Sequence, residues 1–155
     1  MRRLVLLAAA GACALVLASP AAPAIRIGHG IAGVVVGMSQ ASVRTKLGKP
    51  LKVVLAKNEF GPYTELRYRG YVVDLQGNER VTSIVTTLAK EKTPAGVGVG
   101  SLWSQVRAKV PHVRCEGSAT LGDCHVGRLL PGKTVTDFFI RNGKVSRVVV
   151  GIVLD

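Results

Sequence analysis

The sequence predicts an α+β fold of two tandem repeats, each a helix followed by an antiparallel sheet, with the helices packed on one face of the sheet. Three observations predict it. A glycine-rich motif and a helical pattern recur 63 residues apart. Each helical pattern precedes short β-rich runs separated by glycine, proline or asparagine. The last run of each copy follows a turn, Gly77-Asn78 in the first copy and Asn142-Gly143 in the second.

Residues 1 to 24 predict a cleaved signal peptide. Arg2-Arg3 is a basic start, residues 4 to 18 are apolar except for one glycine, and Ala22-Pro23-Ala24 matches the small-x-small pattern of a cleavage site. The alternative is an uncleaved anchor, but about 15 apolar residues are short against the roughly 20 of a spanning helix. Lipidation at Cys13 is disfavoured because the residues before it lack the usual leucine. The chain is therefore expected to be secreted or held in the cell envelope.

Residues 25 to 32 are predicted to form a flexible N-terminus, and His29 is interpreted as part of this mobile end. Gly28 to Gly33 spells G-x-G-x-x-G, but the dinucleotide-binding turn with that motif lies between a strand and a helix. Here the motif precedes a run of valines in a chain with 18 glycines. The match is therefore interpreted as coincidence.

The first repeat is expected over residues 33 to 90. Its helix begins at Ser39 as N-cap and ends at Gly48, and Val43 and Leu47 share one face because they lie four residues apart. Four β-rich runs then predict an antiparallel meander, over 51 to 56, 63 to 69, 71 to 76 and 81 to 88.

The second repeat is expected over residues 94 to 155, after a charged connector at 89 to 94. Ser101 is its predicted N-cap, and Pro111 ends the helix. The buried stripe of this helix is predicted to consist of Leu102, Val106 and Val110. Strands follow over 124 to 129, 134 to 141 and 144 to 154. A unit of about 60 residues buries only a modest core, so the two repeats are expected to pack as one compact unit.

The duplicated pattern of a glycine motif, a short helix and several strands after a signal peptide resembles a known group. It is similar to the β-lactamase-inhibitor-protein-like fold and to the related small outer-membrane assembly lipoproteins of the SmpA/OmlA type. The similarity covers nearly all of residues 31 to 155 and implies helices layered on an antiparallel sheet. It also implies a non-catalytic protein that binds another protein or supports the envelope. The matching positions are Gly33, Gly37, Val43, Leu47, Gly48 and their partners in the second copy.

Cys115 and Cys124 remain after signal cleavage, and an even pair in an exported chain predicts a disulfide. A zinc site that adds His112 and His125 is the alternative. Its spacing fits no zinc finger, and the adjacent Cys124 and His125 are poorly placed to converge on one ion. No metal and no cofactor are therefore expected.

Charge indicates the kind of partner. The chain has a formal net charge of +12 at pH 7, and removal of Arg2 and Arg3 leaves +10. The positive electrostatic potential of such a chain favours contact with anions. The expected partner is an extracellular or envelope protein or an anionic polymer. Nucleic acid is disfavoured because aromatic residues, which stack on bases, make up only 5% of the chain. No membrane span is expected after signal cleavage, and no oligomeric state is predicted.

No catalytic residue is predicted. The sequence contains no G-x-S-x-G elbow, and its acidic residues are scattered singly. The preferred function is a secreted, non-catalytic binding or envelope-associated module. The alternative is a small secreted hydrolase whose site is assembled only in the fold. That alternative predicts a pocket that holds two or more acids, or His112 and His125, with perturbed pKa values.

Residues that the two copies do not share are the candidates for specific binding. Trp103, which aligns with Gln40 of the first copy, is a candidate anchor, and core packing is its alternative role. The other candidates follow the first helix: Asn58, Glu59, Phe60, Tyr63, Arg67 and Arg69.

Overall fold

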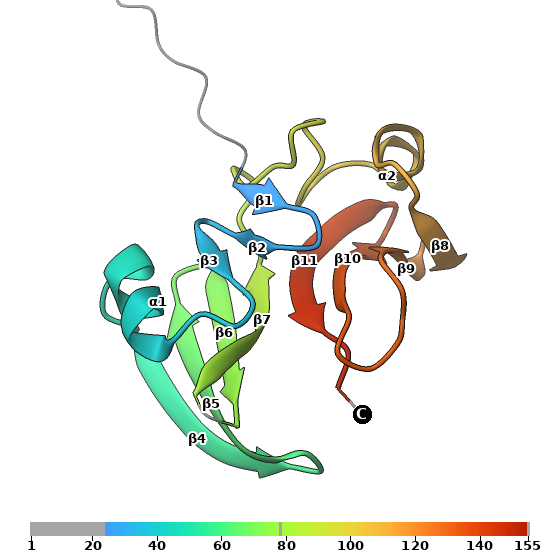
Figure 1. The fold of residues 1–155 in the computed structure, drawn as a ribbon. Helices are drawn as coiled ribbons and strands as arrows, with labels where there is room; N and C mark the ends of the chain where they lie inside the picture. Colours follow the sequence, from blue (N-terminus) through green and yellow to red (C-terminus); the bar gives the residue numbers. More distant parts are fainter. Residues whose placement is uncertain (1–23, 78, 155) are drawn as a thin grey trace, which may run out of the picture.

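The computed structural model describes residues 24 to 77 and 79 to 154. Eight strands of these residues join one antiparallel sheet in the order β4-β5-β6-β7-β11-β10-β9-β8 (Figure 1). Three two-residue strands form a small separate sheet, β1-β2-β3. The strands of the large sheet are β4 (Lys52–Asn58), β5 (Gly61–Tyr68), β6 (Tyr71–Gln76), β7 (Arg80–Thr86), β8 (Arg114–Gly117), β9 (Leu121–Val126), β10 (Thr134–Arg141) and β11 (Lys144–Ile152).

The predicted α+β fold, with helices packed on a sheet in two tandem repeats, is wrong, because the chain is mostly β. Helices α1 (Gln40–Leu47) and α2 (Trp103–Lys109) have only 8 and 7 residues. About two turns of helix cannot cover a sheet of this width. Each helix buries a single side chain, Val43 in α1 and Val106 in α2. Capping residues and helix-ending glycine or proline indicate where a helix begins and ends, but they do not indicate how many of its side chains are buried in the core.

The two groups of consecutive strands meet at β7 and β11, in the middle of the sheet. Their register places Ile84 beside Val150, and both side chains are fully buried. Strand β2 of the small sheet contacts both β7 and β11. The small sheet therefore covers the joint, and the large sheet is continuous across it.

Residues 25 to 32, expected to be flexible, are instead part of the core. They contain β1 (Ile25–Arg26) and β2 (Gly30–Ile31), and β3 (Val34–Val35) follows. Ile25 and Ile31 are only 0% and 1% exposed. These apolar side chains close the core over the large sheet. The predicted signal peptide lies outside the described residues, except for Ala24.

The G-x-G-x-x-G segment forms turns of the small sheet, and the next helix begins only at Gln40. A Cβ atom on Gly30 would lie 1.9 Å from the carbonyl oxygen of Val34. Glycine is required here because the backbones of β2 and β3 approach so closely. The motif therefore has a structural explanation.

The first helix begins as predicted, and the second does not. Ser39 is the N-cap of α1, and its side chain accepts a hydrogen bond from a backbone N–H of the first turn at 3.3 Å. Ser101 is buried, and the N-cap of α2 is Leu102. Leu102 was predicted in the buried stripe but is 46% exposed, whereas Val106 and Val110 are buried.

The connector at residues 89 to 94 is fixed to the sheet by polar contacts. Glu91 is only 5% exposed, and the Tyr71 hydroxyl of β6 donates a hydrogen bond to its carboxylate. Burial raises the pKa of Tyr71, and the Glu91 hydrogen bond and charge raise it further. A backbone bond from Ile25 N to Lys92 O, at 3.0 Å, ties β1 to the same segment. Neither helix of the described residues is long and apolar enough to span a membrane.

Candidate functional site

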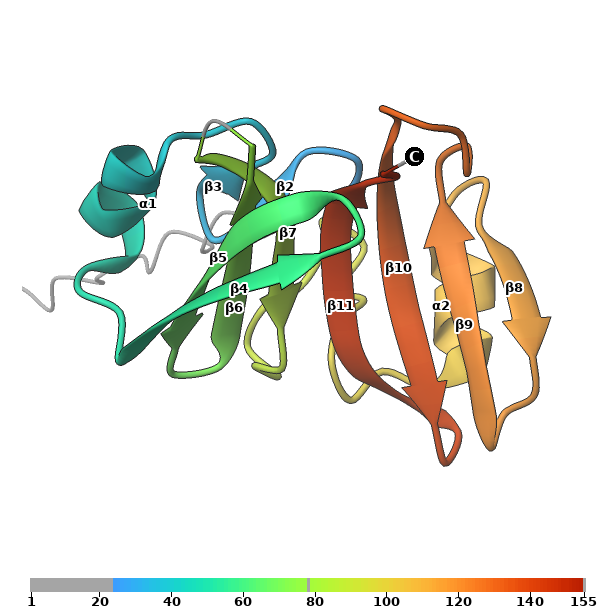
Figure 2. The same cartoon turned by 90° about the horizontal axis from the view of Figure 1, so that it is seen from below.

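One face of the large sheet has no helix over it. Side chains alternate between the two faces of a strand, so Phe138 of β10 points into the core while Asp137 and Phe139 point to the opposite face. We call this second face the open face. Figure 2 shows α2 behind the sheet, at β9 and β10. Polar side chains from several strands gather on the open face: Glu65, Arg67, Asp74, Ser83, Asp123, His125 and Asp137.

One polar group lies on β5, β6 and β7. Register places Glu65 opposite Asp74, and Asp74 opposite Ser83. The Ser83 hydroxyl donates a hydrogen bond of 2.6 Å to the Asp74 carboxylate. These three residues line a hollow of about 260 Å³, together with Tyr63 and Leu154. The fold has therefore brought two acids to one pocket, which is one part of what the hydrolase alternative predicted; that alternative stays a prediction.

The Asp74 carboxyl is electrostatically perturbed. Burial raises its pKa from the ordinary value of 3.8, and the hydrogen bond from Ser83 partly opposes that rise. The Glu65 charge also raises the pKa, and the Arg67 charge lowers it. Arg67 itself forms an ion pair with Glu65. The net effect is a carboxylate that is more costly to ionise in the folded state than in the unfolded chain.

Replacement of Asp74 by asparagine is expected to remove part of the pH dependence of stability. Because the folded pKa is raised, the folded state binds more protons, and stability falls as pH rises through that pKa. The asparagine variant should therefore gain free energy of unfolding relative to the wild type between pH 4 and 7, since its amide oxygen still accepts from Ser83. Urea denaturation at several pH values measures this difference.

Glu59→Gln is the matched control, because Glu59 is exposed in the β4–β5 turn. Its pH curve is the reference for the loss of one exposed carboxylate. Parallel pH curves for Asp74→Asn and the wild type would show that Asp74 does not titrate abnormally.

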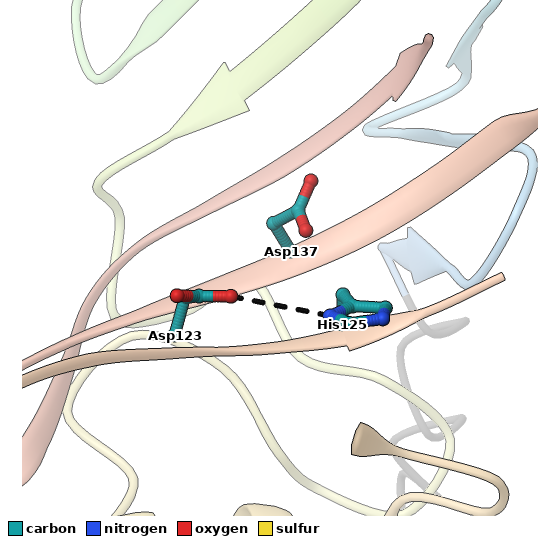
Figure 3. A group of neighbouring side chains, drawn as sticks. All are labelled: Asp123, His125 and Asp137. Carbon is teal, nitrogen blue, oxygen red and sulfur yellow. Dashed lines mark ion pairs between the residues drawn. The ribbon is translucent and has the colours of Figure 1, made fainter. Parts of the chain in front are cut away.

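A second polar group lies at β9 and β10 (Figure 3). Asp137 is directly opposite His125, and Asp123 lies two residues before His125 on the same face of β9. The His125 Nδ1 atom is 4.0 Å from the Asp123 carboxylate. Candidate ligand atoms of all three residues lie within 4.8 Å of one another. Burial raises the pKa of Asp137, the His125 charge opposes this, and Asp123 adds to it.

The predicted disulfide is confirmed, and it excludes the zinc site that used both cysteines. Cys115 and Cys124 are directly opposite each other on β8 and β9 and are bonded. His112 lies in the exposed turn after α2, outside the group at β9 and β10. His125 therefore contributes to a polar group, but with Asp123 and Asp137 rather than with cysteine.

Of the predicted binding residues of the first half, Asn58, Glu59, Phe60 and Tyr63 lie at or near the β4–β5 turn, whereas Arg67 and Arg69 lie toward the other end of β5. The Asn58 side chain accepts hydrogen bonds from the Phe60 backbone N–H at 2.9 Å and from the Gln76 amide at 3.0 Å. Asn58 therefore stabilises the turn. Phe60 is 41% exposed, and Glu59 beside it is exposed. Of the other candidates, Tyr63 lines the polar hollow, Arg67 pairs with Glu65, and Arg69 is exposed in the β5–β6 turn.

Trp103 lies in the other half of the structure, and the fold does not bring it to the β4–β5 turn. It lines a hollow of about 470 Å³ with Arg107, Val113 and Cys115. The Arg107 guanidinium is 5.4 Å from the centroid of the indole ring. The indole Nε1 is buried and has no hydrogen-bond partner among the described residues. Trp103 is partly buried and packs against the core, as the packing alternative predicted, and its role as a binding anchor stays a prediction.

The free edge of β4 is an exposed surface that no local sequence pattern predicted. Leu51, Val53 and Leu55 alternate along this edge and are 75%, 43% and 79% exposed. The alternating pattern predicted a strand, but only the strand order shows that β4 is at the edge of the sheet (Figure 1).

The surroundings of β4 are strongly basic. No acidic residue occurs between residues 33 and 58. None of the basic side chains in this stretch forms an ion pair with a described residue. The β4 edge therefore combines exposed apolar side chains with uncompensated positive charge. Three exposed basic side chains lie on β4 or just before it: Lys49, Lys52 and Lys57.

No family model and no curated protein matches the chain. Solved structures match it at low sequence identity, which shows the fold alone. An extracellular protein with an SCP domain from Bacillus anthracis aligns with a TM-score of 0.53 and 10% identity, over 76% of this chain and 44% of that protein. YjgB, a DUF4309 family protein from Bacillus subtilis, aligns with a TM-score of 0.51 and 13% identity, over 81% of this chain and 88% of that protein.

The uncharacterized protein YfeY from Escherichia coli aligns with a TM-score of 0.50 and 13% identity, over 81% of this chain and 95% of that protein. The chain thus spans less than half of the B. anthracis protein and most of the other two. None of the three is described as a β-lactamase inhibitor protein or an assembly lipoprotein. The resemblance to those families stays a prediction.

Proposed function

We propose that this chain is an exported, non-catalytic module that binds an extended acidic segment of an extracytoplasmic protein along the free edge of β4. The observation that supports this most strongly is a row of exposed apolar side chains at the edge of the sheet: Leu51 just before β4, and Val53 and Leu55 on it. An edge strand also presents unpaired backbone N–H and C=O groups. A partner segment that adds a ninth strand satisfies those groups, and its alternate side chains cover the apolar row.

Three observations support export. The N-terminal sequence has the pattern of a signal peptide, the chain contains a disulfide, and one protein of similar fold is described as extracellular. A position outside the cytoplasm, in the envelope or in the surrounding medium, is part of this proposal.

Charge indicates the composition of the partner segment. The positive field around β4 favours glutamate and aspartate in the partner. It also disfavours a second copy of this chain, since pairing two β4 strands would place the lysines of one copy near those of the other. An extended segment that alternates apolar and acidic residues matches both the apolar side chains of the β4 edge and the positive charge around them.

Two fluorescein-labelled peptides test the proposal. Both match the seven residues of β4 in length. One alternates valine with glutamate, and the other alternates valine with lysine. Fluorescence anisotropy should show binding of the acidic peptide by the purified exported protein and no comparable binding of the basic peptide. A peptide of glutamate alone serves as a polyanion control, and equal binding of it would indicate that charge alone attracts the ligand.

The Leu55→Glu variant should bind the acidic peptide about 10- to 100-fold more weakly, because burial of one leucine contributes about 1.5–3 kcal/mol. Leu129→Glu is the matched control, since Leu129 is 57% exposed and far from β4 in the strand order. It should bind like the wild type. Equal loss in the two variants would assign the effect to net charge and would contradict docking at β4.

A further inference from the structure

The Asp123, His125 and Asp137 group is separate from the β4 edge, because β9 and β10 lie at the opposite end of the sheet order. The sheet register positions it. Cross-strand pairing sets Asp137 beside His125, and the two-residue period of β9 puts Asp123 on the same face. Backbone hydrogen bonds of adjacent strands therefore hold three potential ligands on a rigid surface, not on loops.

The donor set has the chemistry of a transition-metal site. Imidazole nitrogen binds Zn²⁺ and its neighbours in the first transition series, while Mg²⁺ and Ca²⁺ prefer oxygen ligands. Zn²⁺ takes nitrogen and carboxylate oxygen at about 2.0–2.2 Å, so ligand atoms lie roughly 3.4 Å apart around it. The three side chains already have ligand atoms within 4.8 Å of one another. Small side-chain rotations close the remaining gap.

His125 provides a second, independent observation. Its side chain is only 6% exposed, yet it makes no hydrogen bond with a described residue, and its nearest carboxylate is 4.0 Å away. Burial of a polar ring without a partner is costly. Figure 3 shows the Asp123 carboxylate facing the His125 imidazole, with Asp137 beside them on the neighbouring strand. A bound cation would use an imidazole nitrogen that makes no hydrogen bond with a described residue.

No neighbouring basic side chain among the described residues takes the place of a bound cation in this group. Arg114 of β8 lies opposite His125, and Glu116 lies opposite Asp123. Arg114 forms no ion pair with either carboxylate of the group. Asp123 remains 40% exposed, so one side of the group is open to solvent. That side allows an ion to enter and leaves a coordination position for water or for a ligand atom of another molecule.

We propose that Asp123, His125 and Asp137 bind one divalent transition-metal ion, with Zn²⁺ as the best fit, on the open face of the sheet. The protein supplies three ligands, and water completes the coordination. The site does not depend on the proposed peptide binding at β4, and either can fail without the other.

Isothermal titration of tag-free, disulfide-intact protein with ZnCl₂ tests the proposal. The wild type should bind one ion per chain. His125→Ala should weaken binding by more than the roughly 10- to 100-fold that loss of an outer-shell partner costs. His112→Ala removes an exposed histidine outside the group and should leave the affinity unchanged. Asp74→Asn controls for a general effect of acids on the open face.

Circular dichroism without metal checks the fold of each variant. Asp137→Asn, which keeps the side-chain size, replaces His125→Ala if that variant does not fold. Titration with Co²⁺ adds an absorption spectrum that reports nitrogen and oxygen ligands directly. The proposal is overturned if the wild type shows no saturable binding of one ion, if His125→Ala and Asp137→Asn bind like the wild type, if His112→Ala loses binding, or if Mg²⁺ competes on equal terms with Zn²⁺.

Discussion

Replacement of Phe138 by alanine is expected to lower the free energy of unfolding by about 3–5 kcal/mol. Phe138 is the largest fully buried side chain among the described residues. It lies on β10 between Cys124 of β9 and Val148 of β11, which are also fully buried. Strands that are hydrogen-bonded on both sides cannot move inward to fill the space that the ring leaves. The free energy of unfolding of a small domain is only about 5–15 kcal/mol in total, so this single change should bring the protein close to unfolding.

Phe139→Ala is the matched control. Phe139 follows directly in the sequence but lies on the open face, where the Arg147 guanidinium is 4.0 Å from the centroid of its ring. Loss of that contact should cost only about 0.5–1 kcal/mol beyond the small change in buried area. Urea denaturation monitored by circular dichroism measures both variants. A loss for Phe139→Ala equal to that for Phe138→Ala would mean that the two faces of β10 are assigned the wrong way round.

Removal of the disulfide by the double change Cys115→Ala and Cys124→Ala is expected to cost about 2.7 kcal/mol on the chain-entropy model for a loop of about ten residues. The bond joins β8 to β9, and β8 has only 4 residues and a single neighbouring strand. Without the bond, β8 should open first, while the central strands persist. Urea denaturation measures the loss of unfolding free energy, and hydrogen exchange should show faster exchange at β8 and β9.

The losses of unfolding free energy from Phe138→Ala and from the double cysteine change should not be additive, because Phe138 and Cys124 are directly opposite each other in the register. The Phe138→Ala variant should therefore lose less in the disulfide-free background than in the wild type. Strict additivity would show that β8 and β9 are mechanically independent of the β10 core. No loss from the double cysteine change would show that the bond has no structural role.

Local sequence patterns predicted most strands of the large sheet. The runs at 51 to 56 and 134 to 141 correspond to β4 and β10, because alternation and turn residues are properties of neighbouring residues. Strand β8 was not predicted, because four residues around a cysteine carry too little pattern. The small sheet was also missed. Its strands have two residues each, and their place at the start of the predicted mature chain suggested mobility rather than close packing.

The fold class was mispredicted because the balance between helix and strand is a global property. The caps of α1 were visible in the sequence, but the narrow contact of this helix with the core was not. The pairing of β7 with β11 joins residues far apart in the chain, such as Ile84 and Val150, and no local pattern specifies it. Long-range pairing also determines which strand is left at the edge.

The same reasoning explains the candidate sites. Asp123, His125 and Asp137 become neighbours only through the register of β9 and β10, so acids that appear scattered along the sequence form a group in the fold. The exposure of Leu55 depends on the absence of a neighbour beyond β4. The disulfide was predictable because cysteine number and compartment alone indicate it.

Residue-resolved NMR with the valine–glutamate peptide tests docking at β4 most directly. Titration of the ¹⁵N-labelled protein should shift amide signals along residues 51 to 58, with smaller changes in β5, and should slow hydrogen exchange of the outward-facing β4 amides. Signals of Trp103 and of the Asp123, His125 and Asp137 group should stay in place. Shifts that cluster at those residues, with β4 unchanged, would contradict the assignment of β4 as the binding edge.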